Sequence, residues 1–152
     1  ATPENLIYHF KNYLKKNNFV PLNEKQLILL KKSFEFLQPK LKNFSDLHEQ
    51  IAFITNSNPV KVDDETLILS IRSNRKLLED LTLQLQSVTW NRNKLEELLI
   101  NFAEDNQIKF GDLAKPIKGA LLGKIKSPSV IDIMNVLGRD ETVSRFQESK
   151  KL

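Results

Sequence analysis

The sequence has 152 residues and a formal net charge of +4, which is enough chain for one domain or two small subdomains. No apolar run approaches membrane-spanning length, and the N-terminal ATPENLIYHF carries a glutamate and a histidine where the apolar part of a signal peptide would lie. The absence of cysteine excludes disulfides and thiolate metal sites and fits a reducing cytoplasm.

The first part of the chain predicts three helices. Thr2 and Pro3 form an N-cap followed by proline at the first helical position, and a second helix follows Asn23. A third begins with Ser45 as its cap and Phe44 as the apolar residue before the cap. The apolar residues of the three helices recur at helical spacing: Leu6, Ile7, Phe10 and Leu14; Leu27, Leu30, Phe34 and Leu37, stopped by Pro39; Leu47, Ile51 and Ile54.

The middle of the chain predicts a linker and two further helices. Residues 55–64, TNSNPVKVDD, are the best linker candidate because they are polar and contain a proline. A long helix follows, and Trp90 lies in a break before the next. The two apolar stripes are Leu67, Ile68, Ile71, Leu78, Leu81 and Leu85, then Leu95, Leu98, Leu99 and Phe102. No alternation typical of strands is sustained, so we predict an all-α fold of two packed helical bundles, residues 1–58 and 59–152.

Residues 113–128, LAKPIKGALLGKIKSP, combine four lysines with chain-breaking residues and contain no acid. Pro116 predicts the start of a short helix, because proline inside a helix removes a hydrogen bond, and Gly123 suits a left-handed C-terminal cap. Ser127 and Pro128 repeat the cap-and-proline pattern and predict the start of the next helix.

The two helices after this segment complete the predicted fold. The first carries a strongly apolar stripe and stops at Gly138, and Asp140 predicts the cap of the last one. The stripe residues are Val130, Ile131, Met134, Val136 and Leu137, then Val143 and Phe146.

Basic residues are concentrated in two blocks. Residues 11–42 contain eight lysines and two glutamates, a balance of +6, and residues 113–128 add +4. Two such blocks indicate a polyanionic partner, nucleic acid before a membrane surface, and a helix N-terminus beside the second block would attract phosphates. Lysines that merely cover exposed helix faces give the same pattern, so both interpretations stay open at this point.

No catalytic or metal constellation is apparent. The two histidines, His9 and His48, lack metal-ligand spacing, and the acids at 63–65 are ordinary partners of a helix N-terminus. Trp90 is expected to act as a wedge between subdomains rather than to stack on a base. We therefore expect no independent catalysis, no metal site and no bound cofactor.

Four segments of the sequence resemble bacterial-type glutamyl-tRNA synthetases. Residues 115–146, KPIKGALLGKIKSPSVIDIMNVLGRDETVSRF, are similar to the C-terminal signature of that family, as are residues 90–116, WNRNKLEELLINFAEDNQIKFGDLAKP. Residues 36–47, FLQPKLKNFSDL, and 58–67, NPVKVDDETL, also have counterparts in the family. The resemblance covers essentially the whole chain.

The resemblance implies the anticodon-binding helical cage of such an enzyme. The parent would be a glutamate–tRNA ligase that uses ATP and magnesium. Its His-x-Gly-His-like and Lys-x-Ser-Lys-type catalytic motifs do not occur in this sequence, so the chain alone should be inactive. The implied partners are a glutamate-accepting tRNA and the catalytic domain of the same parent chain, in a cytoplasmic monomer without a membrane partner. An independent helical protein-interaction or adaptor module is the alternative.

The resemblance also implies which residues approach the anticodon: Lys40, Lys118, Ser127, Pro128 and Val130. Secondary RNA contacts are expected at three neighbouring lysines: Lys115, Lys124 and Lys126. In such a site the unstacked anticodon bases are read by side chains and helix ends, while lysines neutralise the backbone.

The chain departs from the family at three positions. Lys40 and Lys118 stand where many members have arginine, and Ile100 stands where some place another arginine. A lysine is a point charge that cannot form the planar fork of arginine. Transfer RNA binding is therefore expected, with less sharp reading of the anticodon.

Overall fold

The computed structural model describes residues 2–37, 43–57 and 59–152. Within them all regular structure is helical, which confirms the predicted all-α class. In chain order the helices are α1 (Pro3–Lys16), α2 (Glu24–Leu37), α3 (Phe44–Gln50), α4 (Ala52–Thr55), α5 (Glu65–Ser73), α6 (Arg75–Leu85), α7 (Arg92–Asp105), α8 (Phe110–Leu122), α9 (Val130–Leu137) and α10 (Arg139–Ser149).

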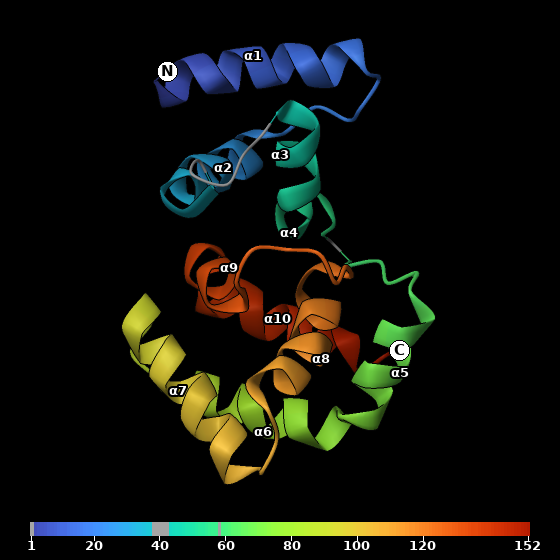
Figure 1. The fold of residues 1–152 in the computed structure, drawn as a ribbon, viewed down its shortest axis with the longest axis vertical. Coiled ribbons are helices and arrows are strands. Elements are labelled where there is room, and N and C mark those ends of the chain that lie inside the picture. The colour runs from blue at the N-terminus through green and yellow to red at the C-terminus, as the bar shows by residue number, and fades with distance from the viewer. Residues whose placement is uncertain (1, 38–42, 58) are drawn as a thin grey trace.

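The helices form two groups that meet near the middle of the molecule. Figure 1 shows α1, α2 and α3 at one end and α5 to α8 at the other, with α4, α9 and α10 between them. Helix α2 contacts α9 and α4 contacts α8, and a cluster of buried apolar side chains extends from Ile7 in α1 to Phe146 in α10. The division into residues 1–58 and 59–152 stays a prediction, and its boundary residue lies outside the described residues.

The first two helices begin where their caps predict. The side-chain oxygen of Thr2 accepts a hydrogen bond of 3.2 Å from the backbone N–H of Asn5. At the start of α2, Asn23 Oδ1 accepts from the N–H of Gln26 at 2.8 Å, and Gln26 Oε1 accepts from the N–H of Asn23 at 2.9 Å. This reciprocal pair satisfies two donors that a helix start otherwise leaves free.

The predicted cap of the third helix is wrong. Helix α3 begins at Phe44, and Asn43 Oδ1 accepts from the N–H of Asp46 at 2.8 Å, so Ser45 lies inside the first turn. Asparagine caps a helix at least as well as serine. The earlier start also places the Phe44 ring 5.8 Å from that of Phe10 on α1, where both gain from burial.

The predicted long helix from Leu67 to Leu85 is interrupted at Asn74, which separates α5 from α6. The backbone of Asn74 has φ −117° and ψ 24°, and its Nδ2 donates 2.7 Å to the carbonyl of Ser70. An asparagine amide that bonds nearby backbone offers the chain an alternative to a continuous helix.

Pro116 does not start a helix; it lies inside α8, which begins at Phe110. An interior proline costs about 3 kcal/mol. The apolar face of α8 outweighs that cost, because Leu113, Ile117 and Leu121 are fully buried and each contributes roughly 1.5–3 kcal/mol.

The predicted starts of the last two helices are also shifted. Ser129 rather than Ser127 caps α9, through a 3.2 Å bond from the N–H of Ile131 to its hydroxyl, while the Ser127 hydroxyl donates to the carbonyl of Pro128. Helix α10 begins directly after Gly138 without a side-chain cap, so Asp140 lies in its first turn. There a carboxylate still favours the positive end of the helix.

Candidate nucleic-acid interface

Helix α8 ends and α9 begins at one corner of the molecule, which we call the α8–α9 corner (residues 118–130). The N–H of Gly123 donates to the carbonyl of Lys118 at 3.0 Å, and Gly123 has φ +69°. A Cβ at Gly123 would lie 2.2 Å from the carbonyl oxygen of Lys61. The corner therefore packs directly on the loop that follows α4, and that contact requires glycine.

Asn56 bonds this loop to the corner. Its Nδ2 donates 2.8 Å bonds to the carbonyls of Leu122 and Lys61, and its Oδ1 accepts from the N–H of Lys61 at 2.8 Å. Of the predicted linker, Thr55 is the last residue of α4, and the described residues 56–57 and 59–64 lie outside any helix. Asn56 ties this loop to the end of α8. The C-terminal carbonyl of that helix is thereby satisfied.

The corner and the turn of α8 before it carry lysines with different surroundings. Lys118 is half-buried on α8, and Lys115 and Lys124 are exposed. Within the described residues none of these three lies in an ion pair. The pKa of Asp64 is lowered mainly by the hydrogen bond from the Thr66 hydroxyl, with a smaller contribution from the charge of Lys115.

Lys126 is the corner lysine with an acidic partner. Its Nζ lies 3.3 Å from a carboxylate oxygen of Glu49 on α3, and both side chains are more than half exposed. An exposed pair of this kind contributes little to stability. It does show that α3 lies beside the connector between α8 and α9.

The remaining predicted site residues are shielded to different degrees. Ser127 is half-buried, Pro128 is buried, and the Val130 side chain is 2% exposed in the core. The buried Val130 side chain therefore offers no surface to a ligand and helps to hold the start of α9 in place. Lys40 lies outside the described residues, and Ile100 is an exposed residue of α7.

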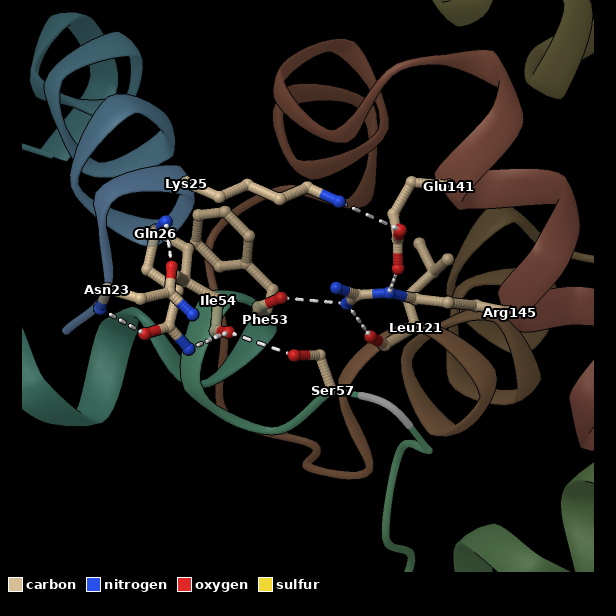
Figure 2. Close-up of polar contacts among 9 residues, drawn as sticks. All are labelled: Asn23, Lys25, Gln26, Phe53, Ile54, Ser57, Leu121, Glu141 and Arg145. Atoms are coloured by element: carbon tan, nitrogen blue, oxygen red, sulfur yellow. Dashed lines mark hydrogen bonds and ion pairs between the residues drawn. The ribbon is translucent and has the colours of Figure 1, made fainter. Parts of the chain in front are cut away.

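Arg145 lies in this region and was not among the residues predicted from the sequence. Its side chain is 6% exposed, and Nη1 donates bonds of 2.7 Å to the carbonyl of Phe53 and 2.6 Å to that of Leu121. Nε donates 2.8 Å to the carboxylate of Glu141 (Figure 2). One buried side chain thus holds α4, α8 and α10 together behind the corner.

A signal for Arg145 was present in the sequence. Four buried residues of α10 follow the spacing of one helix face, and they are Thr142, Arg145, Phe146 and Ser149. A charged residue on a buried face needs partners, because an unpaired buried charge is costly. The spacing could have identified Arg145, but its partners lie far away in the sequence.

Trp90 fills a structural position. Its Nε1 donates 3.0 Å to the carbonyl of Met134, and the guanidinium carbon of Arg139 lies 5.3 Å from its ring centroid. Arg139 also donates to the carbonyls of Leu85 and Val88 at 2.7 and 2.6 Å. The half-buried indole therefore joins the loop between α6 and α7 to α9, and a hydrogen bond occupies its polar edge.

The described residues contain neither a cluster of metal ligands nor a helix suited to crossing a membrane. Among them, no group of three or more His, Cys, Asp or Glu side chains is placed to hold a metal ion. His48 instead stacks on Phe19 with ring centroids 4.2 Å apart. No described helix is both long enough and apolar enough to cross a membrane.

Comparison with known proteins gives sequence relatives over nearly the whole chain. A family model described as an anticodon binding domain matches residues 5–150. Glutamate–tRNA ligase 2 of Ruegeria pomeroyi is 35% identical over 144 residues, covering 95% of this chain and 31% of that protein. Glutamate–tRNA ligase 1 of Jannaschia sp. is 34% identical over 147 residues, covering 97% and 31%. The chain spans about a third of the length of these relatives.

Solved structures show the same fold. A glutamate tRNA ligase from Elizabethkingia meningosepticum, in complex with its amino acid, has a TM-score of 0.74 at 21% identity, covering 99% of this chain and 29% of that one. A glutamate-tRNA synthetase from Elizabethkingia anophelis gives 0.70 at 21% identity, covering 100% and 29%. At this identity the likeness shows the helical arrangement alone.

Proposed function

The chain belongs to the anticodon binding domain family, and from this premise we propose that it binds the anticodon loop of a glutamate-accepting tRNA. The observation that carries the proposal is the family match over residues 5–150, which includes both helical groups and the α8–α9 corner. The lysines of that corner provide the positive charge that an RNA backbone requires.

We propose that unstacked anticodon bases meet the corner at the start of α9. Lys118 would neutralise a phosphate or donate to a base edge, and the Ser127 hydroxyl would contribute a polar contact. Pro128 and Val130 would fix the position of the start of α9. Lys40, which lies outside the described residues, would contact the anticodon loop. Lys115, Lys124 and Lys126 would add charge without reading sequence, since phosphate contacts position an RNA rather than specify it.

The relatives are glutamate–tRNA ligases of which this chain spans about a third. The proposed parent is accordingly a glutamate–tRNA ligase whose catalytic domain binds ATP and magnesium outside this chain. The chain alone would carry no cofactor and no ligase activity. We propose a cytoplasmic monomer that holds the anticodon arm while the catalytic domain of the same parent charges the tRNA.

We propose that the chain discriminates only modestly between glutamate tRNA and other tRNAs. Lysine at positions 40 and 118 supplies a point charge in place of a bidentate fork, and Ile100 offers no polar contact. Each good bidentate contact to a base contributes roughly 1–3 kcal/mol of discrimination. The ratio of affinities for cognate and unrelated tRNA should therefore be smaller than arginines at these positions would give.

The test is a titration of the chain with glutamate tRNA and an unrelated tRNA, followed by fluorescence anisotropy at two salt concentrations. We expect tighter binding of glutamate tRNA and a marked loss of affinity for both RNAs at higher salt. Lys118→Gln should weaken binding more than Arg72→Gln, its control on the exposed face of α5, with circular dichroism to verify both folds. Equal affinity for both tRNAs, or no dependence on salt, would instead favour a protein-interaction module.

A further inference from the structure

A second stretch of the chain also lacks acids. Between Glu4 and Glu24 there is no aspartate or glutamate, and this stretch contains Lys11, Lys15 and Lys16. It covers most of α1 and the loop before α2. All three lysines are exposed, and within the described residues none of them lies in an ion pair. The proposed anticodon site uses none of them.

Two of these lysines, Lys11 and Lys15, border a groove of about 670 Å³ between α1 and the loop that follows it, which we call the α1–α2 groove. Lys11 and Lys15 contribute the basic side chains, and Phe19, Pro21 and Leu22 contribute apolar surface. No described residue lining the groove is acidic. The groove therefore combines apolar surface with uncompensated positive charge, which favours an anionic ligand with apolar parts.

The wall of the groove is fixed by hydrogen bonds. After α1 the N–H of Phe19 donates to the carbonyl of Leu14 at 2.9 Å, and the N–H of Asn18 donates to that of Lys15 at 3.3 Å. Asn18 has φ +60°, the left-handed conformation that asparagine tolerates at helix ends. These bonds hold the loop wall of the groove in place, and an ordered wall reduces the entropy cost of binding.

Helix α3 connects this groove with the α8–α9 corner. The Phe19 ring stacks on His48 with centroids 4.2 Å apart, and the next residue, Glu49, pairs with Lys126 of the corner at 3.3 Å. With seven residues, α3 is about 10 Å long at 1.5 Å per residue. Figure 1 shows α3 between α1 and the connector that follows α8. The two acid-free stretches, distant in sequence, therefore lie close enough for one RNA to contact both.

We infer that the α1–α2 groove is a second RNA-contact surface, which binds phosphates of the same tRNA outside its anticodon; this inference rests on the proposed function. Lys11 and Lys15 are four residues apart on α1 and lie on one face, so both can reach one strand. The amides of Asn12 and Asn18 line the same groove and can donate to phosphate or sugar oxygens. Ribose carbons would pack on Phe19 and Leu22. Continuity with the corner favours this RNA over an acidic protein segment.

The decisive variant is Lys11→Gln/Lys15→Gln, tested with full-length glutamate tRNA and with the seven-nucleotide anticodon loop as a free oligonucleotide. The control is Lys76→Gln/Lys109→Gln, which removes the same charge from α6 and from the residue that precedes α8. All four substituted lysines are exposed, and circular dichroism verifies that both double variants are folded. Affinities are measured by anisotropy at several salt concentrations.

We expect the groove variant to bind full-length tRNA about tenfold more weakly at low salt, with a salt slope smaller by about 0.9 for each lost contact. Its affinity for the free loop should be unchanged, and the control should behave as wild type. A groove variant that binds full-length tRNA like wild type, while Lys118→Gln weakens both RNAs, overturns the groove and leaves the proposed function standing. A protein ligand in the groove would give that same result. If wild type discriminates no tRNA, the proposed function itself fails.

Discussion

Nη1 of Arg145 donates a hydrogen bond of 2.7 Å to the carbonyl of Phe53, a residue 92 positions earlier in the chain. The same nitrogen donates to the carbonyl of Leu121, and the Arg145 side chain is 6% exposed. One buried cation therefore connects α4 to α8 and α10. Leu121 belongs to the α8–α9 corner, so the placement of this proposed RNA surface relative to α4 depends on Arg145.

Replacing Arg145 with methionine should destabilise the fold by about 3 kcal/mol, because two buried carbonyls and the Glu141 carboxylate lose their partner. Urea denaturation of wild type and variant measures this difference. The control is Lys25→Met, since Lys25 is exposed and 3.9 Å from Glu141; a loss below about 0.5 kcal/mol is expected there. A loss below about 1 kcal/mol in the Arg145 variant would show that the junction is not held by the guanidinium.

Two glycine-to-alanine substitutions, one at the α8–α9 corner and one as its control, test the packing of the corner. Gly123→Ala places a Cβ 2.2 Å from the carbonyl oxygen of Lys61 and forces φ +69° on alanine. The left-handed conformation alone costs about 1–2 kcal/mol, and the clash with backbone adds to it. Gly111→Ala meets nothing within 4 Å inside the first turn of α8 and should raise stability by about 0.5–1 kcal/mol. Thermal unfolding of both variants measures the contrast, and two equal midpoints would contradict it.

The sequence predicted the fold well where a local rule has a single candidate. Thr2 and Asn23 were the obvious caps of α1 and α2, and each accepts the expected backbone bond. The predictions were wrong where two candidates stand close together. Asn43 competes with Ser45, and Ser129 competes with Ser127, and the choice depends on how the helix packs.

Other features depend on contacts that no local pattern contains. Pro116 stays inside α8 because the buried face of that helix is worth more than the bond it loses. The acid-free character of residues 113–128 was evident in the sequence, whereas the approach of Lys126 to Glu49 required the structure. The partners of Arg145 likewise come from two other helices.

His48 makes stability depend on pH. Burial against Phe19 lowers the pKa of His48 below its ordinary value of 6.5. Between the folded and unfolded pKa values the unfolded chain holds more protons, so stability rises with pH across that window and is lost as pH falls.

Urea denaturation between about pH 5.5 and 7.5 measures this effect, because the window lies where histidine titrates. His48→Gln should flatten the dependence in this range, and the difference between variant and wild type isolates His48 from the carboxylates. If the free energy of unfolding of variant and wild type depended on pH equally, burial of the His48 ring would not oppose its protonation.

The ion pair between Lys126 and Glu49 makes a specific prediction about RNA affinity. Glu49 is an exposed acid between the two proposed RNA surfaces, and it partly neutralises Lys126. Glu49→Gln removes the repulsion of phosphates and frees Lys126, so the chain should bind glutamate tRNA about threefold more tightly at low salt, with a salt slope steeper by about 0.9. The control is Glu148→Gln, which breaks a similar exposed pair with Lys151 at 3.1 Å and should leave affinity unchanged. If both variants tighten binding equally, the gain comes from net charge alone and Lys126 does not contact the RNA. If only Glu49→Gln tightens binding, the RNA passes beside α3.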